Sequence, residues 1–100
     1  STDTSPIVAA GHWMLDYNEN MAEVAFSVAD EYQHRGIGTH LLRFLIRVAR
    51  ERGIGGFKAL VLLENRAMMG VFRKSGYVLQ TEIGAGEISL SFRFDEAKAA

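Results

Sequence analysis

Apolar and polar residues alternate strictly near the start of the chain. From Ala22 to Val28 every second residue is apolar, and Glu23 and Ser27 lie among the residues between them. Because residues two apart share one face of a strand, this pattern predicts a half-buried β-strand over 21–28. The apolar stretch at 6–15 predicts a preceding strand, and the polar run at 16–20 is typical of a turn.

The middle of the chain has a helical period instead. Over 35–52 apolar residues recur three and four positions apart, and Arg43, Arg47 and Arg50 occupy the remaining face. Glycines at 53, 55 and 56 are expected to end this helix. A second helix is predicted over 66–75, because Asn65 is a favourable N-cap and Gly76 suits the position after the last turn.

Three further strands complete the predicted order β-β-α-β-α-β-β. The near-continuous apolar run at 57–63 predicts a strand covered on both faces. Strands are also predicted over 77–81 and 87–94, joined by a turn at 84–86. Strand–helix–strand units of this kind indicate the α/β class, with helices packed on a mixed sheet.

Length and composition exclude several classes of protein. One hundred residues predict a single domain over 1–100, with ends that we expect to be flexible at 1–5 and 95–100. A formal net charge of −1 gives no reason to expect nucleic acid as a partner, and no apolar run is long enough to span a membrane.

The absence of cysteine excludes disulfides and a Cys nucleophile, and it fits a cytoplasmic location. His12, His34 and His40 lack metal-ligand spacing, so we expect no metal.

A glycine loop follows the strand at 21–28 and opens the long helix. Glycine lets backbone N–H groups approach a ligand closely, and the first N–H groups of a helix lack internal partners. Gly36 and Gly38 therefore indicate a pyrophosphate site, although a lone G-x-G is more often a plain turn with flexible glycines. A dinucleotide fingerprint would need a third glycine where Leu41 stands, and no Gly-Lys-Ser/Thr triplet of a P-loop is present.

Two motifs at matching distances give the sequence a family resemblance. The loop from Gln33 to Gly38 has the form Q-x-x-G-x-G, and Asn65 is followed by the run Phe72-Arg73-Lys74-Ser75-Gly76-Tyr77. Over nearly its whole length the chain resembles the GNAT superfamily of N-acetyltransferases. Segments 22–26 and 64–68 are similar to the C-terminal GNAT domain of bacterial protein lysine acetyltransferases of the Pat type. Complete members have an N-terminal strand, a helix pair and another strand before residue 6, so we expect a truncated GNAT fold that lacks much of the acceptor side.

The resemblance implies that acetyl-CoA is the co-substrate. It places the backbone of three strand residues along the pantetheine arm and Asn65 near the thioester. Gln33 orders the loop, and N–H groups of the loop and the first helical turn surround the pyrophosphate. The implied cofactor residues are Phe26, Ser27, Val28, Gln33, His34, Arg35, Gly36, Ile37, Gly38, Thr39 and Asn65.

The implied reaction is direct attack of an amine, expected to be a protein lysine, on the thioester. A lysine has a pKa of about 10.4 and must lose a proton first. Glu23 matches the general base of the Pat-type enzymes and has the small residues Ala25 and Ser27 on its face of the strand. Phe72 stands where many members have a tyrosine acid, which is a departure from the pattern. The implied protein partner is a substrate such as an acyl-CoA synthetase.

Two other functions stay open at this point. Phe72 and the missing N-terminal elements favour a non-catalytic acyl-CoA-binding or regulatory module. A structural domain whose loop binds nothing is the third alternative, against which the intact Gln33, Gly36, Gly38 and Asn65 argue. An open apolar flank also suggests a possible homodimer.

Overall fold

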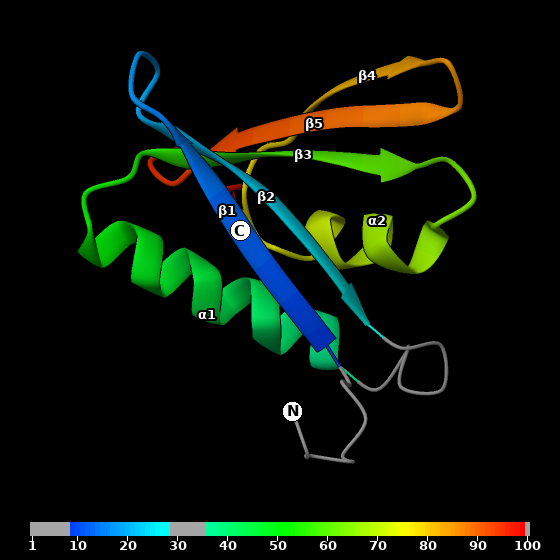
Figure 1. The fold of residues 1–100 in the computed structure, drawn as a ribbon, viewed down its shortest axis with the longest axis horizontal. Helices are drawn as coiled ribbons and strands as arrows, with labels where there is room; N and C mark the ends of the chain where they lie inside the picture. Colours follow the sequence, from blue (N-terminus) through cyan, green and yellow to red (C-terminus); the bar gives the residue numbers. More distant parts are fainter. Residues whose placement is uncertain (1–8, 29–35, 100) are drawn as a thin grey trace, which may run out of the picture.

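A five-stranded sheet carries two helices on one of its faces (Figure 1). This computed structural model describes residues 9–28 and 36–99. The predicted element order is confirmed. The elements are β1 (Ala9–Asp16), β2 (Met21–Val28), α1 (Ile37–Glu51), β3 (Gly56–Leu62), α2 (Arg66–Arg73), β4 (Gln80–Gly84) and β5 (Glu87–Arg93).

The strands lie in the order β1-β2-β3-β5-β4, which confirms the predicted mixed sheet. Neighbouring strands are antiparallel except β2 and β3, which run parallel. A parallel pair needs a long crossover connection, and α1 lies in this one. The crossover carries the chain from the end of β2 back to the start of β3.

The strand predicted at 77–81 is wrong in position, because β4 begins only at Gln80. Tyr77 instead stacks its ring on Phe92 at a centroid distance of 5.4 Å and forms an isolated bridge with Ala97. The aromatic side chain of Tyr77 is typical of a strand, but it packs against the sheet from a segment outside it. The turn at 84–86 is confirmed, with positive φ at Ala85 and Gly86 as a two-residue hairpin requires.

The C-terminal segment is connected to the end of α2 by hydrogen bonds. Val78 N–H donates to the Glu96 carbonyl at 2.9 Å, and Lys98 N–H donates to the Gly76 carbonyl at 2.8 Å. The Lys98 ammonium also donates to the Arg73 carbonyl. Flexibility of 95–100 stays a prediction, and residues 1–5 lie outside the described part of the chain.

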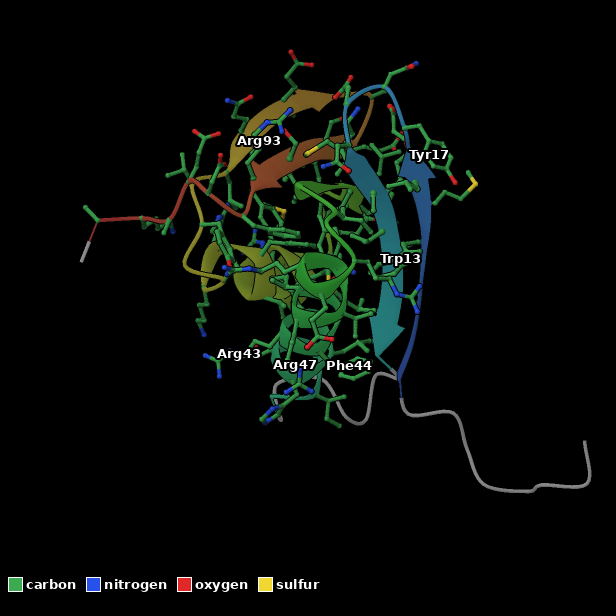
Figure 2. All side chains as sticks on the ribbon, turned by 90° about the vertical axis from the view of Figure 1, so that its left-hand side faces the viewer. Trp13, Tyr17, Arg43, Phe44, Arg47 and Arg93 are labelled. Carbon is green, nitrogen blue, oxygen red and sulfur yellow. The ribbon has the colours of Figure 1, made fainter. Side chains whose placement is uncertain are left out.

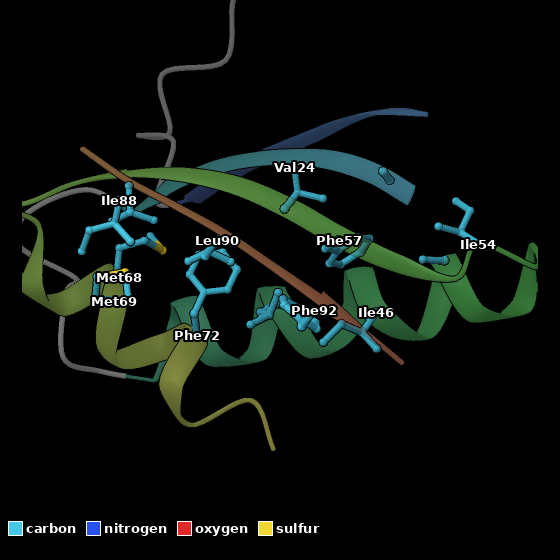
Figure 3. Packing of buried hydrophobic residues seen from close by; sticks show 14 residues of the cluster. Val24, Ile46, Ile54, Phe57, Met68, Met69, Phe72, Ile88, Leu90 and Phe92 are labelled. Atoms are coloured by element: carbon cyan, nitrogen blue, oxygen red, sulfur yellow. The ribbon is translucent and has the colours of Figure 1, made fainter. Parts of the chain in front are cut away.

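The hydrophobic core lies between the sheet and both helices (Figure 3). Phe57 of β3 is fully buried at its centre, with ring centroids of Phe92 and Phe94 at 5.9 and 5.1 Å. Figure 2 shows the strands curving around the two helices. Met68 and Met69 of α2 belong to this core, as apolar residues on an amphipathic helix are expected to.

The prediction that the strand at 57–63 is covered on both faces is wrong. Burial alternates along β3: Phe57 and Val61 face the helices, whereas Leu60 and Leu62 are 66% and 53% exposed. Both helices pack on the same face of the sheet, so the other face of its central strand stays open. This open face is the setting of the site described below.

Candidate functional site

The parallel strands β2 and β3 pair over only three positions and then separate (Figure 1). The last pair is Glu23 with Lys58, although β2 continues to Val28 and stays paired with β1. Beyond Glu23 the edge of β2 that faces β3 therefore has no ladder partner in the described residues. Unpaired backbone groups of this kind can bind an extended ligand.

The two strands meet closely because β3 begins with glycine. A Cβ placed on Gly56 would overlap the Phe92 carbonyl oxygen and would lie 2.8 Å from Met21 Sδ. Gly56 thus permits the tight junction of β2, β3 and β5 from which the gap opens.

Glu23 lies at the apex of this gap, on the open face of the sheet. It is solvent-exposed and lines a hollow of about 820 Å³ together with Met14, Ala25, Lys58 and Leu60. No ion pair involves Glu23 within residues 9–28 and 36–99. A carboxylate in this position can accept a proton from a group that enters the hollow.

Lys58 is the partner of Glu23 in register, but its ammonium binds elsewhere. Lys58 Nζ lies 2.8 Å from Glu19 Oε2 and 3.6 Å from Asp16 Oδ2, both at the β1–β2 turn. The hydrogen bond to Glu19, followed by the charges of Glu19 and Asp16, raises the pKa of Lys58 above its usual 10.5, against the opposing effect of desolvation. This cluster was not predicted, because no sequence signal links residues so far apart in the chain.

The start of α1 lies on the face of the sheet that carries the helices (Figure 1). Gly36 caps α1 with φ 79° and ψ 2°, a left-handed conformation that glycine adopts without strain. The first N–H groups of α1, those of Ile37, Gly38 and Thr39, have no partner one turn earlier in the helix. The first turn contains no acidic residue, so its partial positive charge is available to an anion.

A second hollow, of about 410 Å³, joins this helix N-terminus to α2. Gly36, Gly38 and Thr39 line one side, and Asn65 lies on the other. The structure thus brings together predicted site residues that are far apart in the sequence. Asn65 Oδ1 accepts a hydrogen bond from Met68 N–H at 3.1 Å, which confirms the predicted N-cap.

Two positively charged side chains lie at the edge of this second hollow. Arg66 and Lys74 are exposed and lie at opposite ends of the α2 face that lines it, with Gly70 between them. A Cβ on Gly70 would contact nothing within 4 Å, so the helix surface is open there. Arg66 and Lys74 give the hollow a positive rim that suits a phosphate ligand.

The remaining predicted residues fall in three groups. The backbone of Phe26, Ser27 and Val28 forms the end of β2 along the gap. Gln33, His34 and Arg35 lie outside the described residues. Phe72 is 2% exposed and packs in the core with its ring centroid 6.2 Å from that of Phe92, so it supplies no acid to either hollow.

Neither a metal cluster nor a membrane helix is found in the described residues. Across 9–28 and 36–99 no group of three or more His, Cys, Asp or Glu side chains is placed to hold a metal ion. In the same residues no helix is long and apolar enough to cross a membrane. The described residues offer a carboxylate in an open groove and a helix start whose N–H groups can bind an anion.

Several known proteins are similar to this chain in sequence and in fold. Acetyltransferase Pat of Mycolicibacterium smegmatis is 42% identical over 74 residues, which are 73% of this chain and 22% of Pat. The crystal structure of the GNAT domain of S. lividans PAT superposes with a TM-score of 0.76 at 34% identity, covering 93% of this chain and 57% of that one. A cAMP-binding acyltransferase from Mycobacterium smegmatis gives a TM-score of 0.72 at 36% identity, over 88% of this chain and 27% of that one.

These relatives are longer than the chain, which spans less than a quarter of the length of Pat. A domain from Methanocaldococcus jannaschii shares the fold with a TM-score of 0.76 at only 15% identity. Residues 3–77 match the Acetyltransferase (GNAT) family. The gap between β2 and β3, the open start of α1 and this match lead to one conclusion: the chain belongs to the GNAT acetyltransferase family.

Proposed function

We propose that this chain transfers an acetyl group from acetyl-CoA to a lysine of a protein, with Glu23 as general base. The observation that carries the proposal is the position of Glu23 in the last β2–β3 pair, where the two strands separate. An exposed carboxylate at the apex of a gap in the sheet can reach both a ligand in the gap and a group that enters from the open face.

The cofactor would lie across the two features described above. Its pantetheine arm would hydrogen-bond to the free edge of β2 at Phe26, Ser27 and Val28. Its pyrophosphate would accept hydrogen bonds from the N–H groups of Gly36 to Thr39, where the helix dipole favours negative charge. By resemblance, Gln33, His34 and Arg35 complete this loop, and Asn65 lies near the thioester.

The chemistry of the step follows from these positions. Glu23 takes a proton from the lysine ammonium, and the neutral amine then attacks the thioester carbonyl carbon. A C–N bond forms and the C–S bond breaks, the nitrogen gives its second proton to solvent, and coenzyme A leaves as its thiolate. Phe72 is buried and has no hydroxyl, so no acid from this position serves the thiolate. A thiolate is a fair leaving group, since an alkyl thiol such as that of free cysteine has a pKa of about 8.5.

A protein is the acceptor that suits the open face best. The hollow around Glu23 has a volume of about 820 Å³ between the described residues, and exposed Leu60 and Met14 offer apolar contacts beside it. Similarity to Pat supports a bacterial protein substrate, and we propose an acyl-CoA synthetase. A cytoplasmic location belongs to the same proposal, since the chain has no cysteine and both substrates would be met there.

Two alternative hypotheses involve the same surfaces, namely the cofactor site and the open face of the sheet. Phe72 favours a non-catalytic module that binds acyl-CoA without transferring its acyl group. The exposed Leu60 and Leu62 favour a homodimer that covers the open face. Light scattering that shows a monomer at high concentration would contradict the dimer, and acetylation of a synthetase would contradict the non-catalytic module.

Calorimetric titration of acetyl-CoA into the 100-residue chain tests the proposal. We expect binding by the wild type, and binding at least about tenfold weaker in Lys74→Glu and Gly38→Glu, which place negative charge at the phosphate hollow. Lys74 is exposed, so Lys74→Glu should fold even where the buried Gly38 does not tolerate substitution. Absence of binding by a folded wild type, or equal binding by a folded Lys74→Glu chain, would count against this cofactor site.

A further inference from the structure

A third hollow lies beside α1, away from both parts of the proposed site. It has a volume of about 430 Å³ and is bounded by α1 and by the chain that follows α2. It shares no lining residue with the groove around Glu23 or with the glycine-loop hollow. Arg43, Arg47 and Arg50 line one side, and Ser75 and Tyr77 line the other.

The three arginines lie on one flank of α1 because they are four and three positions apart. All three are exposed, and none forms an ion pair with another described residue. Arg50 Nη1 donates to the Tyr77 hydroxyl at 3.3 Å, which fixes one guanidinium at the wall of the hollow. Figure 2 shows Arg43 and Arg47 projecting from α1 on the side away from β4 and β5.

Like charges at this spacing repel one another and weaken a helix slightly. Glu51 is the only acidic residue that lines the hollow in the described part of the chain. The flank therefore carries a concentrated positive charge within a chain whose formal net charge is −1. An anionic partner would relieve this repulsion, because no ion pair within residues 9–28 and 36–99 offsets it.

An exposed aromatic ring adjoins this charge. Phe44 is 52% exposed, and the guanidinium carbon of Arg47 lies 5.8 Å from the centre of its ring. Arginine and aromatic side chains are the residues most enriched in protein–protein contacts and among their energetically dominant positions. A lone phosphate would use the arginines but would leave Phe44 uncovered.

We propose that Arg43, Phe44, Arg47, Arg50 and Tyr77, here called the arginine surface, dock an acidic segment of a partner protein. Carboxylates of the partner pair with the guanidinium groups, and an apolar side chain of the partner covers Phe44. The arginines are confined to one flank of a single helix and border both a hollow and an exposed aromatic ring, which suits a peptide segment with an apolar side chain better than the regularly spaced phosphates of a nucleic acid. The docking surface is independent of acetyl transfer, because it shares no residue with that site.

Binding of a defined peptide tests this docking surface. The probe is a synthetic peptide of glutamates interspersed with leucine. Its binding is followed by NMR of the ¹⁵N-labelled chain. We expect amide shifts concentrated at 43–51 and 75–77. Binding should weaken by about tenfold or more when Arg43→Glu and Arg47→Glu are combined, and less in Phe44→Ala. Addition of salt should weaken binding, since the contacts are exposed charges.

Arg93→Glu is the matched control, because Arg93 is an exposed arginine on β5 (Figure 2). Equal weakening by Arg93→Glu would show attraction to overall charge and would overturn the proposal. Displacement of the peptide by a DNA duplex at equal charge concentration would overturn it in favour of a nucleic-acid surface. No shift at 43–51 in a folded chain would overturn it as well. Acetyl-CoA titration of the same variants separates this result from the proposed function, since they should keep wild-type affinity.

Discussion

Glu23 and Lys58 face each other in the last pair of the β2–β3 ladder, yet they do not neutralise each other. The Lys58 ammonium is drawn to the β1–β2 turn, where Glu19 Oε2 lies 2.8 Å away. Glu23 is therefore left without a cationic partner in the described residues, at the point where the strands separate. A carboxylate free of an ion pair can accept a proton from an incoming ammonium.

Removal of the charge at Glu23 should slow the chemical step and spare cofactor binding. In Glu23→Gln we expect acetyl-CoA affinity close to wild type and a turnover about 10²- to 10⁴-fold lower, the range for loss of a general base. Steady-state acetylation of an acyl-CoA synthetase, combined with calorimetry, measures both. Glu82→Gln is the control, because Glu82 lines the same hollow from β4. Unchanged turnover in Glu23→Gln would remove Glu23 from the mechanism.

The Lys58 cluster should appear in the dependence of stability on pH. Because its pKa is raised in the folded chain, Lys58 contributes stability that is complete below the unfolded pKa near 10.5 and is lost as pH rises through the folded value. Lys58→Met should remove this loss, so the difference in unfolding free energy between wild type and variant should shrink at high pH. Urea unfolding between about pH 8 and about pH 11 measures it. A difference that does not change with pH would show that the ion pairs do not stabilise the chain.

Gly56 should be far less tolerant of a methyl group than Gly70. Gly56→Ala would push Cβ into the Phe92 carbonyl and toward Met21 Sδ, so we expect a loss of about 1–3 kcal/mol in unfolding free energy. Gly70→Ala adds a methyl group to an open position inside α2 and should stabilise the chain by about 0.5–1 kcal/mol. Denaturant unfolding of both variants checks the contrast. A Gly56→Ala chain as stable as wild type would mean that the junction of β2, β3 and β5 can widen freely.

Asn65 has two proposed roles, which substitution can separate. Asn65→Ala should cost about 1 kcal/mol of stability because Met68 N–H loses its acceptor, whereas Asn65→Ser keeps an acceptor oxygen and should cost little. If Asn65 also contacts the cofactor, Asn65→Ser should weaken acetyl-CoA binding while leaving stability intact. Thermal unfolding and calorimetry on the two variants distinguish the roles. Wild-type affinity in Asn65→Ser would leave this residue as a helix cap alone.

Local patterns were sufficient for much of the fold. The alternation at 21–28 predicted β2 with its observed bounds, and the cap at Asn65 predicted the start of α2. Both signals depend on neighbours in the chain, namely the two-residue period of a strand and the free N–H groups of a first helical turn. The sequence-based prediction was wrong where tertiary contacts determine the structure. Tyr77 packs against Phe92 and does not enter a strand, and Leu60 is exposed although its strand was predicted to be covered on both faces.

Part of the candidate site could likewise be predicted from the sequence, and part is visible only in the tertiary structure. The sequence by itself indicated that glycine opens the first helix, and it marked Glu23 and Asn65 through family resemblance. Gly36 has the left-handed conformation at this helix start that glycine adopts without strain. Only the tertiary structure decided that Glu23 lies where β2 and β3 part, that Asn65 faces the start of α1, and that Lys58 binds Glu19. The physical reason is that these relationships depend on strand register and on both helices packing on one face of the sheet. They are contacts between distant segments, and local periodicity does not encode them.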